Sequence, residues 1–336
     1  MLHRAVVVGA GGISQVWFPA LKEEGIEVAA VVDLSEDAAR ARVEEFDLDA
    51  AVSTDLEATL EAVQPEFVVD LTVPAAHCEV TCTALEAGCH VIGEKPMAAS
   101  MEEARRMVET SERTGKLYMV SQSRRYNEKH DRVRLTLEAG DLGRPTIVNC
   151  TFYLDPHFGG FRDEMESPLI LDMAIHHFDL LRFLTDLDPV SVYSYEYNPA
   201  HSWYAGDAAA SCIFRMSEGV VFNYVGCWCG QGCRTSWNGD WRLVCENGTM
   251  LYERDEDPWG EVVVMGEDGR ETRDLEVAES PMEHPGQRGA LHELIRFLET
   301  GEAPQCECHD NMKSLAMVFA AMESSRRGER IAVEQR

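Results

Sequence analysis

The sequence predicts an α/β protein with two domains: a doubly wound parallel sheet, then an α+β domain with a large open, mainly antiparallel sheet. Residues 1–122 alternate near-continuous apolar strands with amphipathic helices, which is typical of a parallel sheet covered on both faces. After about residue 122 the pattern changes to strands with a period of two, separated by Glu218-Gly219, Asn247-Gly248 and Asp268-Gly269, which are typical hairpin turns. We therefore place the domains at 1–122 and 123–336, with the last helix packing back on the first domain.

The first domain is expected to hold five strands, at 5–9, 27–33, 67–73, 90–93 and 117–121. Helices are expected between and after them, at 14–24, 35–46, 55–63, 76–87 and 100–114. Ser35, Asp55 and Ser100 each precede a helical pattern as N-caps, and Ser100 with Glu103 forms a capping box.

The second domain is expected to begin with helices at 132–139 and 168–184. Period-2 strands follow at 190–197, 208–215, 220–228, 241–246, 249–253, 261–265 and 272–277. Two helices, 288–300 and 310–327, close the chain. The open sheet needs a cover on its second face, and a partner subunit would supply one, so we expect a homodimer or homotetramer.

The composition argues against several partners. The formal net charge is −29, which would repel nucleic acid and anionic membranes. Two explanations of this acidic composition stay open, a high-salt cytosol and GC-rich coding bias. No apolar run approaches the roughly 18 residues of a membrane helix, and the run at residues 5–10 is better explained as a buried strand than as a signal peptide. We expect a cytoplasmic protein whose 11 scattered Cys are reduced.

A glycine-rich loop joins the first strand to the first helix. Gly9 permits the tight turn, and Gly11 lets the backbone approach a pyrophosphate at a helix N-terminus. Ser14 stands at the third glycine position, where its hydroxyl could reach phosphate, and Asp33 ends the second strand, where a carboxylate accepts hydrogen bonds from an adenosine ribose. This carboxylate favours NAD, although NADP stays open. The predicted cofactor residues here are Gly9, Gly11, Gly12, Ile13, Ser14 and Asp33.

Two further segments suggest catalysis. Lys95 lies between Glu94 and Pro96 at the end of a strand, on the sheet edge where ligands bind. Asp172 and His176 are four residues apart, so they share one helix face, where the carboxylate can orient the imidazole. A solvated surface amine and a structural Asp–His pair are the alternatives.

These motifs, in this order and spacing, resemble the glucose–fructose oxidoreductase / inositol dehydrogenase (Gfo/Idh/MocA) family. The resemblance covers nearly the whole chain. It implies that Lys95 and His176 flank a nicotinamide ring, that His176 takes a hydroxyl proton, that Lys95 stabilises the alkoxide, and that Asp172 orients His176. It also implies that the Lys95–Pro96 bond is often cis, and it adds to the cofactor residues Thr72, Val73, Pro74, His77, Glu94, Lys95 and Arg162.

The chain departs from the family pattern in two places. Phe161-Arg162 stands where the family often has Trp-Arg, and Ser167-Pro168 stands where it has Gly-Gly. We take Arg162 as a cofactor or substrate candidate. Arg124, Arg125, Tyr126 and His157 are weaker substrate candidates, since each could equally serve a domain interface.

The expected function is an NAD(P)-dependent dehydrogenase that oxidises a hydroxyl of a sugar, inositol or related polyol, or catalyses the reverse reduction. The alternatives are a glycosidase that retains NAD and works by transient oxidation and elimination, and a nucleotide-sensing regulator without catalysis. No metal is expected, because Cys227, Cys229 and Cys233, like Cys306, Cys308 and His309, do not form paired C-x-x-C ligands.

Overall fold

The computed structural model describes residues 3–267 and 269–334 and contains two compact units. The first consists of the described residues up to Tyr126 with Glu283–Leu315, and the second of the described residues between Asn127 and Met282 with those from Ala316 onward. The domain boundary that we place at residues 122 and 123 stays a prediction. Within the described part of the chain, no helix is both long and apolar enough to cross a membrane.

The first unit holds a six-stranded parallel sheet in the order β3-β2-β1-β4-β5-β6. The order reverses between β1 and β4, and this switch point is where the doubly wound fold binds its ligands, beyond the carboxyl ends of the strands. The strands are β1 (Arg4–Val8), β2 (Glu27–Val32), β3 (Ala51–Ser53), β4 (Phe67–Asp70), β5 (His90–Gly93) and β6 (Tyr118–Val120).

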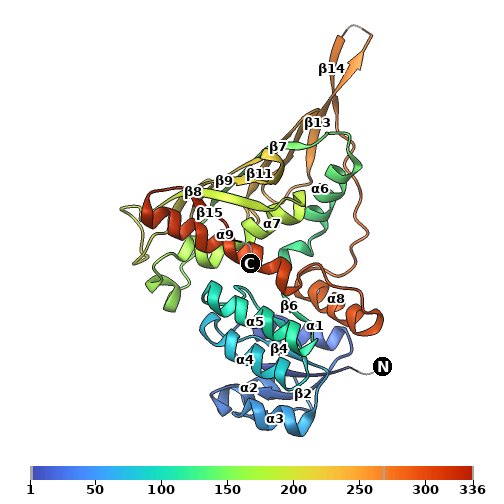
Figure 1. Ribbon diagram of the computed structural model, residues 1–336, viewed down its shortest axis with the longest axis vertical. Helices are drawn as coiled ribbons and strands as arrows, with labels where there is room; N and C mark the ends of the chain where they lie inside the picture. The colour runs from blue at the N-terminus through green and yellow to red at the C-terminus, as the bar shows by residue number, and fades with distance from the viewer. Residues whose placement is uncertain (1–2, 268, 335–336) are drawn as a thin grey trace. The chain divides into compact units, whose positions relative to one another are not determined.

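Helices cover both faces of this sheet. Because crossover connections are right-handed, the reversal of strand order puts the helices after β1 and β4 on opposite faces; α4 packs on α5, while α1 packs on α8 (Figure 1). The predicted N-caps are confirmed, since Ser35, Asp55 and Ser100 each accept a hydrogen bond from the backbone of their helix. The helices are α1 (Ser14–Glu23), α2 (Glu36–Glu45), α3 (Leu56–Val63), α4 (Pro74–Glu86), α5 (Met101–Thr114) and α8 (Gly286–Thr300), with a 3₁₀ turn η1 at Ser123–Arg125.

The second unit holds a nine-stranded sheet in the order β14-β13-β12-β11-β7-β10-β9-β8-β15. Every neighbouring pair is antiparallel except β7 and β10, which run parallel, so the sheet is mixed but mainly antiparallel. The expected turns at Glu218-Gly219 and Asn247-Gly248 join β9 to β10 and β11 to β12; the third expected turn includes residue 268, outside the described residues. The strands are β7 (Pro145–Tyr153), β8 (Pro189–Tyr197), β9 (Ala209–Met216), β10 (Val221–Cys227), β11 (Asp240–Cys245), β12 (Gly248–Tyr252), β13 (Trp259–Gly266), β14 (Gly269–Asp274) and β15 (Ile331–Ala332).

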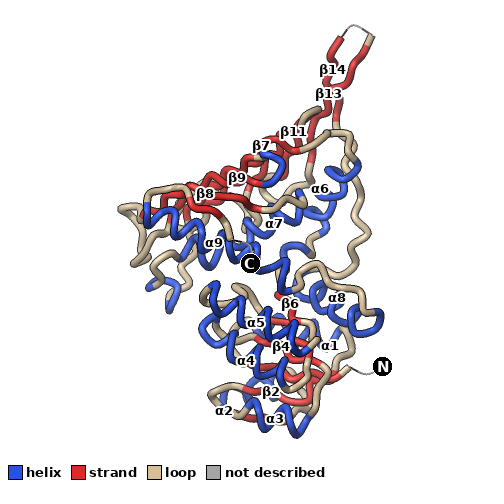
Figure 2. Tube along the Cα trace, in the orientation of Figure 1, coloured by secondary structure: helices blue, strands red, loops and turns tan. Residues whose placement is uncertain are grey.

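One face of this sheet is covered by α6 (Glu128–Ala139), α7 (Ile175–Thr185) and part of α9 (Cys308–Arg327) (Figure 2). Phe178 of α7 packs its ring against Phe214 and Tyr224, at 4.9 and 5.3 Å between centroids. The side chains on the opposite face alternate with the buried ones and are exposed, among them the large apolar residues Ile147, Tyr193, Tyr195, Tyr197 and Ile213.

The helix expected at 168–184 is wrong in its first part. Residues Leu169–Ala174 form a π-helix, and the α-helix α7 begins only at Ile175. A π-helix widens the turn by one residue, which the spacing of apolar side chains does not distinguish from an α-helix, and such turns are frequent at functional sites.

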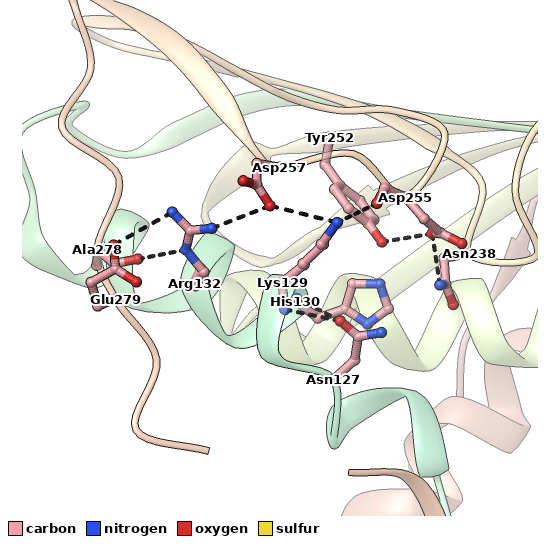
Figure 3. A network of polar contacts seen from close by, with 10 residues as sticks. All are labelled: Asn127, Lys129, His130, Arg132, Asn238, Tyr252, Asp255, Asp257, Ala278 and Glu279. Carbon is pink, nitrogen blue, oxygen red and sulfur yellow. Dashed lines mark hydrogen bonds and ion pairs between the residues drawn. The ribbon is translucent and has the colours of Figure 1, made fainter. Parts of the chain in front are cut away.

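A polar network fixes the loop after β12 to the start of α6 (Figure 3). One Asp255 carboxylate oxygen accepts hydrogen bonds from Asn238 (2.8 Å) and the Tyr252 hydroxyl (2.7 Å), and Lys129 donates to the Asp255 carbonyl. Lys129 and Arg132 both pair with Asp257, at 3.5 Å each. These contacts hold Asp255 in the left-handed conformation (φ 56°) without a glycine.

Candidate functional site

The glycine-rich loop leaves β1 at the switch point of the first sheet. The Gly9 amide donates to the Val32 carbonyl (2.8 Å), and Gly9 has φ +102°. A Cβ at this position would lie 2.7 Å from the carbonyl carbon and oxygen of Leu71, so only glycine fits. A Cβ on Gly11 or Gly12 would meet no atom within 4 Å, which leaves room for a ligand against the backbone. The loop therefore fits a pyrophosphate.

Asp33 is held beside this loop by backbone donors. One carboxylate oxygen accepts from the Ala10 amide (2.7 Å) and the other from the Ser35 amide (2.9 Å). Arg42 donates to the Ala10 carbonyl (3.2 Å), which ties the loop to α2. An ionised carboxylate accepts about four hydrogen bonds, so Asp33 retains capacity for the two hydroxyls of a ribose.

Ser14 has a different environment from the one expected. Its side chain is fully buried, and its hydroxyl donates to the Gly11 carbonyl at 2.6 Å. This hydrogen bond ties the first turn of α1 to the loop, and a contact of Ser14 with phosphate stays a prediction. Ile13 lies at the N-cap position of α1.

A second group of predicted residues lies beyond the carboxyl end of β4. The buried Asp70 accepts from the Thr72 hydroxyl (2.6 Å) and pairs with His77 Nδ1 (3.0 Å). The other ring nitrogen of His77, Nε2, is buried and has no hydrogen-bond partner in the described chain. Val73 is exposed and Pro74 begins α4, so the four predicted residues Thr72, Val73, Pro74 and His77 border the same switch point as the glycine loop.

Glu94 and Lys95 follow β5, the next strand in the sheet. Glu94 is buried, where one carboxylate oxygen accepts from the Trp17 indole (2.8 Å) and the other from the Lys95 amide (3.2 Å). Burial raises the pKa of Glu94, an effect that the Trp17 hydrogen bond and the Lys95 charge oppose. The Lys95–Pro96 peptide bond is cis. Glu94 thus fixes the backbone of Lys95 from the protein interior.

The other predicted catalytic residues lie in the second unit. Asp172 is in the π-helix and His176 is in the first turn of α7. Asp172 makes a salt bridge of 2.6 Å with Arg162 Nε, and the Arg162 guanidinium lies over the Phe161 ring, 4.7 Å from its centroid. The sequence predicts a pairing of Asp172 with His176 and does not indicate this salt bridge to Arg162. The convergence of Lys95 with these residues on one substrate stays a prediction.

Family models match most of the chain. Residues 3–122 match an oxidoreductase family model described as an NAD-binding Rossmann fold, and residues 130–251 match the C-terminal domain of the same family. The chain belongs to the Gfo/Idh/MocA oxidoreductase family. Its first unit contains an NAD(H)-binding Rossmann domain, and the protein is an oxidoreductase of this family.

Several known proteins resemble the chain at low identity. The 1,5-anhydro-D-fructose reductase of Ensifer adhaerens is 24% identical over 99% of this chain and 99% of its own length. The inositol 2-dehydrogenase of Pseudomonas syringae is 31% identical over 55% of each chain. An Agrobacterium radiobacter oxidoreductase, solved with NAD⁺, L-tartaric acid and magnesium, has a TM-score of 0.86 at 21% identity over 99% of both chains.

The weaker substrate candidates of this Gfo/Idh/MocA protein differ in burial and in the unit to which they belong. Arg125 is buried and donates to the Gln305 carbonyl (2.8 Å) and to Asp310 (2.7 Å). Tyr126 is also buried, and its hydroxyl donates to Glu293 at 2.8 Å. These contacts engage both side chains within the first unit. Arg124 is half-buried in η1, whereas His157 is exposed in the second unit and stacks on Trp203, 3.7 Å between ring centroids.

His177, the neighbour of His176, is fully buried. Its ring lies 4.8 Å from that of Phe152, and its Nε2 lies 3.4 Å from the Trp237 carbonyl. This is the packing role that adjacency on the helix predicts, because a neighbour points about 100° away around the axis.

Proposed function

We propose that this protein transfers a hydride between nicotinamide and a carbon that carries a hydroxyl group in a sugar, inositol or related polyol. The observation that carries the proposal is Lys95: a buried carboxylate holds its backbone at the carboxyl edge of the same sheet that presents the nucleotide loop. The names of the relatives, a 1,5-anhydro-D-fructose reductase and an inositol 2-dehydrogenase, support this substrate class.

The proposed chemistry needs a base and a cation near the reacting oxygen. Nicotinamide, when bound, accepts the hydride that leaves the carbon. His176 takes the hydroxyl proton as general base, and the Lys95 ammonium stabilises the negative charge that develops on the oxygen. Asp172 orients His176 and balances its charge after protonation. Arg162, through its salt bridge, holds the Asp172 carboxylate in place.

The proposed cofactor preference is NAD. The backbone amides of Ala10 and Ser35 orient the Asp33 carboxylate at the end of β2, where it would accept from ribose hydroxyls and repel a 2′-phosphate. The kcat/KM for NAD should therefore exceed that for NADP with the same substrate.

Lys95→Ala tests the proposal. The variant should still bind NADH, because the glycine loop and Asp33, which hold the pyrophosphate and ribose, are intact. Its turnover should fall by at least about 100-fold, because one electrostatic donor to the developing alkoxide is lost. Lys22→Ala, an exposed amine on α1 of the same unit, is the matched control.

The assay uses a panel of inositols, aldoses and sugar acids with NAD or NADP, and follows nicotinamide absorbance. Unchanged turnover in Lys95→Ala would remove the role that we assign to this amine. Release of sugar without net NADH would favour the NAD-retaining glycosidase, and binding without any turnover on the panel would favour the nucleotide-sensing regulator.

We also propose that the exposed face of the nine-stranded sheet joins two copies of this chain in a homodimer or homotetramer. Its exposed Ile147, Tyr193, Tyr195, Tyr197 and Ile213 give a larger apolar surface than isolated surface residues would.

A further inference from the structure

Three potential metal ligands gather at the end of α1, away from the strand ends that carry the nucleotide loop. Glu24 caps the C-terminus of α1, His292 lies on α8, and His284 lies in the segment just before α8. One carboxylate oxygen and two imidazole nitrogens all lie within 4.8 Å of one another. Glu24 is nearly buried, and His284 and His292 are partly buried.

The separations suit a small tetrahedral cation. Zinc with bonds of about 2.0–2.1 Å places its ligand atoms about 3.4 Å apart. His292 Nδ1 lies 3.3 Å from Glu24 Oε2, which already matches this value. His284 Nδ1 lies 3.9 Å from the other oxygen, Glu24 Oε1, and the three ligand atoms lie within 4.8 Å of one another, so the His284 ring would move closer when a metal ion binds.

His284 Nδ1 gives a second, independent indication. This atom is buried and has no hydrogen-bond partner within the described chain. The ring of His284 lies 4.2 Å from that of His292, centroid to centroid. A buried ring nitrogen facing a carboxylate without a hydrogen bond is unusual, and a cation bound to its lone pair would satisfy it.

Arg288 leaves the site open to a cation. Its Nε donates to Glu24 Oε1 at 2.6 Å and its NH1 pairs with Glu23 at 3.0 Å, so Oε2 of Glu24 faces His292. Ligating carboxylates usually receive such an outer hydrogen bond, which orients them toward the metal.

A second group of potential ligands, Glu307, Cys308 and His309, is weaker. His309 already engages two carboxylates, Glu112 at 2.9 Å and Glu307 at 2.7 Å. Burial raises the pKa of the Cys308 thiol to about 12, with a further rise from Glu307, so the thiolate that would bind zinc is disfavoured.

We propose that Glu24, His284 and His292 bind a zinc ion, with one open coordination position, and so join the end of α1 to the segment that begins α8. The set of two His and one Glu is one that zinc accepts. Because α1 starts at the nucleotide loop, the bound ion would anchor the opposite end of the helix that carries this loop.

The test measures metal binding directly. Protein stripped with a chelator is titrated with ZnCl₂ by calorimetry, and with CoCl₂ by visible absorption, whose intensity reports tetrahedral coordination. We expect one tight equivalent per chain and a rise in melting temperature with zinc. His292→Ala should weaken zinc binding by more than about 10-fold, because the loss of a group that only supports a metal ligand already costs about that much.

His309→Ala is the matched control. It removes the imidazole of the group formed by Glu307, Cys308 and His309, and it should leave the tight binding of one zinc ion per chain unchanged. His292→Gln serves if an alanine variant folds poorly, since His292 is the most exposed of the three. Circular dichroism and NADH binding confirm that the variants are folded. The proposal is wrong if the natural protein takes up no stoichiometric zinc, if His292 variants bind it unchanged, or if only His309→Ala loses it.

Discussion

Glu196 on β8 should make the stability of the second unit depend on pH. Only 8% of Glu196 is exposed, and its Oε1 is buried without a hydrogen-bond partner in the described chain. Burial raises the pKa of Glu196 from 4.5 to about 7; a hydrogen bond from Ser167 opposes this, while the charges of Asp207 and Glu166 add to it. The carboxyl group is therefore protonated in the folded protein at pH values where the unfolded chain has already lost that proton.

The sign follows from proton linkage. Between pH 4.5 and about 7 the folded state binds more protons than the unfolded state, so the free energy of unfolding falls as the pH rises through this window. Above the pKa of Glu196 in the folded state, the full free-energy cost of ionising this buried carboxyl group is present. A pKa rise of this size corresponds to about 3 kcal/mol at most. Glu196→Gln removes the ionisation, so the variant should be more stable than the natural protein at pH 8 by up to about 3 kcal/mol, and equal to it near pH 4.5.

Urea unfolding at pH 5, 6, 7 and 8, followed by tryptophan fluorescence, measures this difference. Five of the six tryptophans lie within residues 127–282, so the signal reports mainly the second unit. Glu261→Gln, at an exposed position of β13, is the control and should show no such trend. A stability difference that stays constant from pH 5 to pH 8 would refute the proposed titration of Glu196.

Two further predictions follow from the fold. Gly9→Ala forces a Cβ to within 2.7 Å of the Leu71 carbonyl at φ +102°, so we expect at least a 10-fold loss of NADH affinity by fluorescence titration and a destabilisation of about 1–3 kcal/mol; affinity equal to that of the natural protein would contradict the close approach. Tyr195→Glu combined with Ile213→Arg places charges on the exposed sheet face, so light scattering should show a smaller assembly than for the natural protein. A natural protein that is already monomeric would remove the proposed interface.

Most of the first unit could be predicted because its strands are buried on both faces and its helix starts carry polar caps. The exception is β3, whose three residues Ala51–Ser53 are too short and too exposed to give a pattern. In the second unit the strand β7 was missed, although its last five residues alternate between buried and half-buried positions. Pro145 and two exposed residues at its start concealed that alternation, and its parallel pairing with β10 comes from contacts distant in sequence.

The site residues that directly follow a strand could be predicted from sequence. The contacts between side chains from distant segments could not. The glycine loop, Asp33 and Lys95 each follow a strand of one parallel sheet, so their common edge could be inferred from sequence. The Arg162–Asp172 salt bridge joins a loop to a π-helix that periodicity cannot reveal. The hydrogen bond from Trp17 to Glu94 spans 77 residues, and no spacing rule anticipates it.

The assignment of Glu283–Leu315 to the first unit limits how this protein can be divided. The backbone passes from one unit to the other at three places, and the last of these lies inside the continuous helix α9. A fragment that stops at residue 122 would lack α8 and so leave the Glu24 end of α1 bare. A nucleotide-binding fragment of this protein must therefore contain both the residues up to 126 and residues 283–315. The same holds for a gene fusion or an exchange of the first unit with that of a homologue. A single cut in the chain will not release either unit intact.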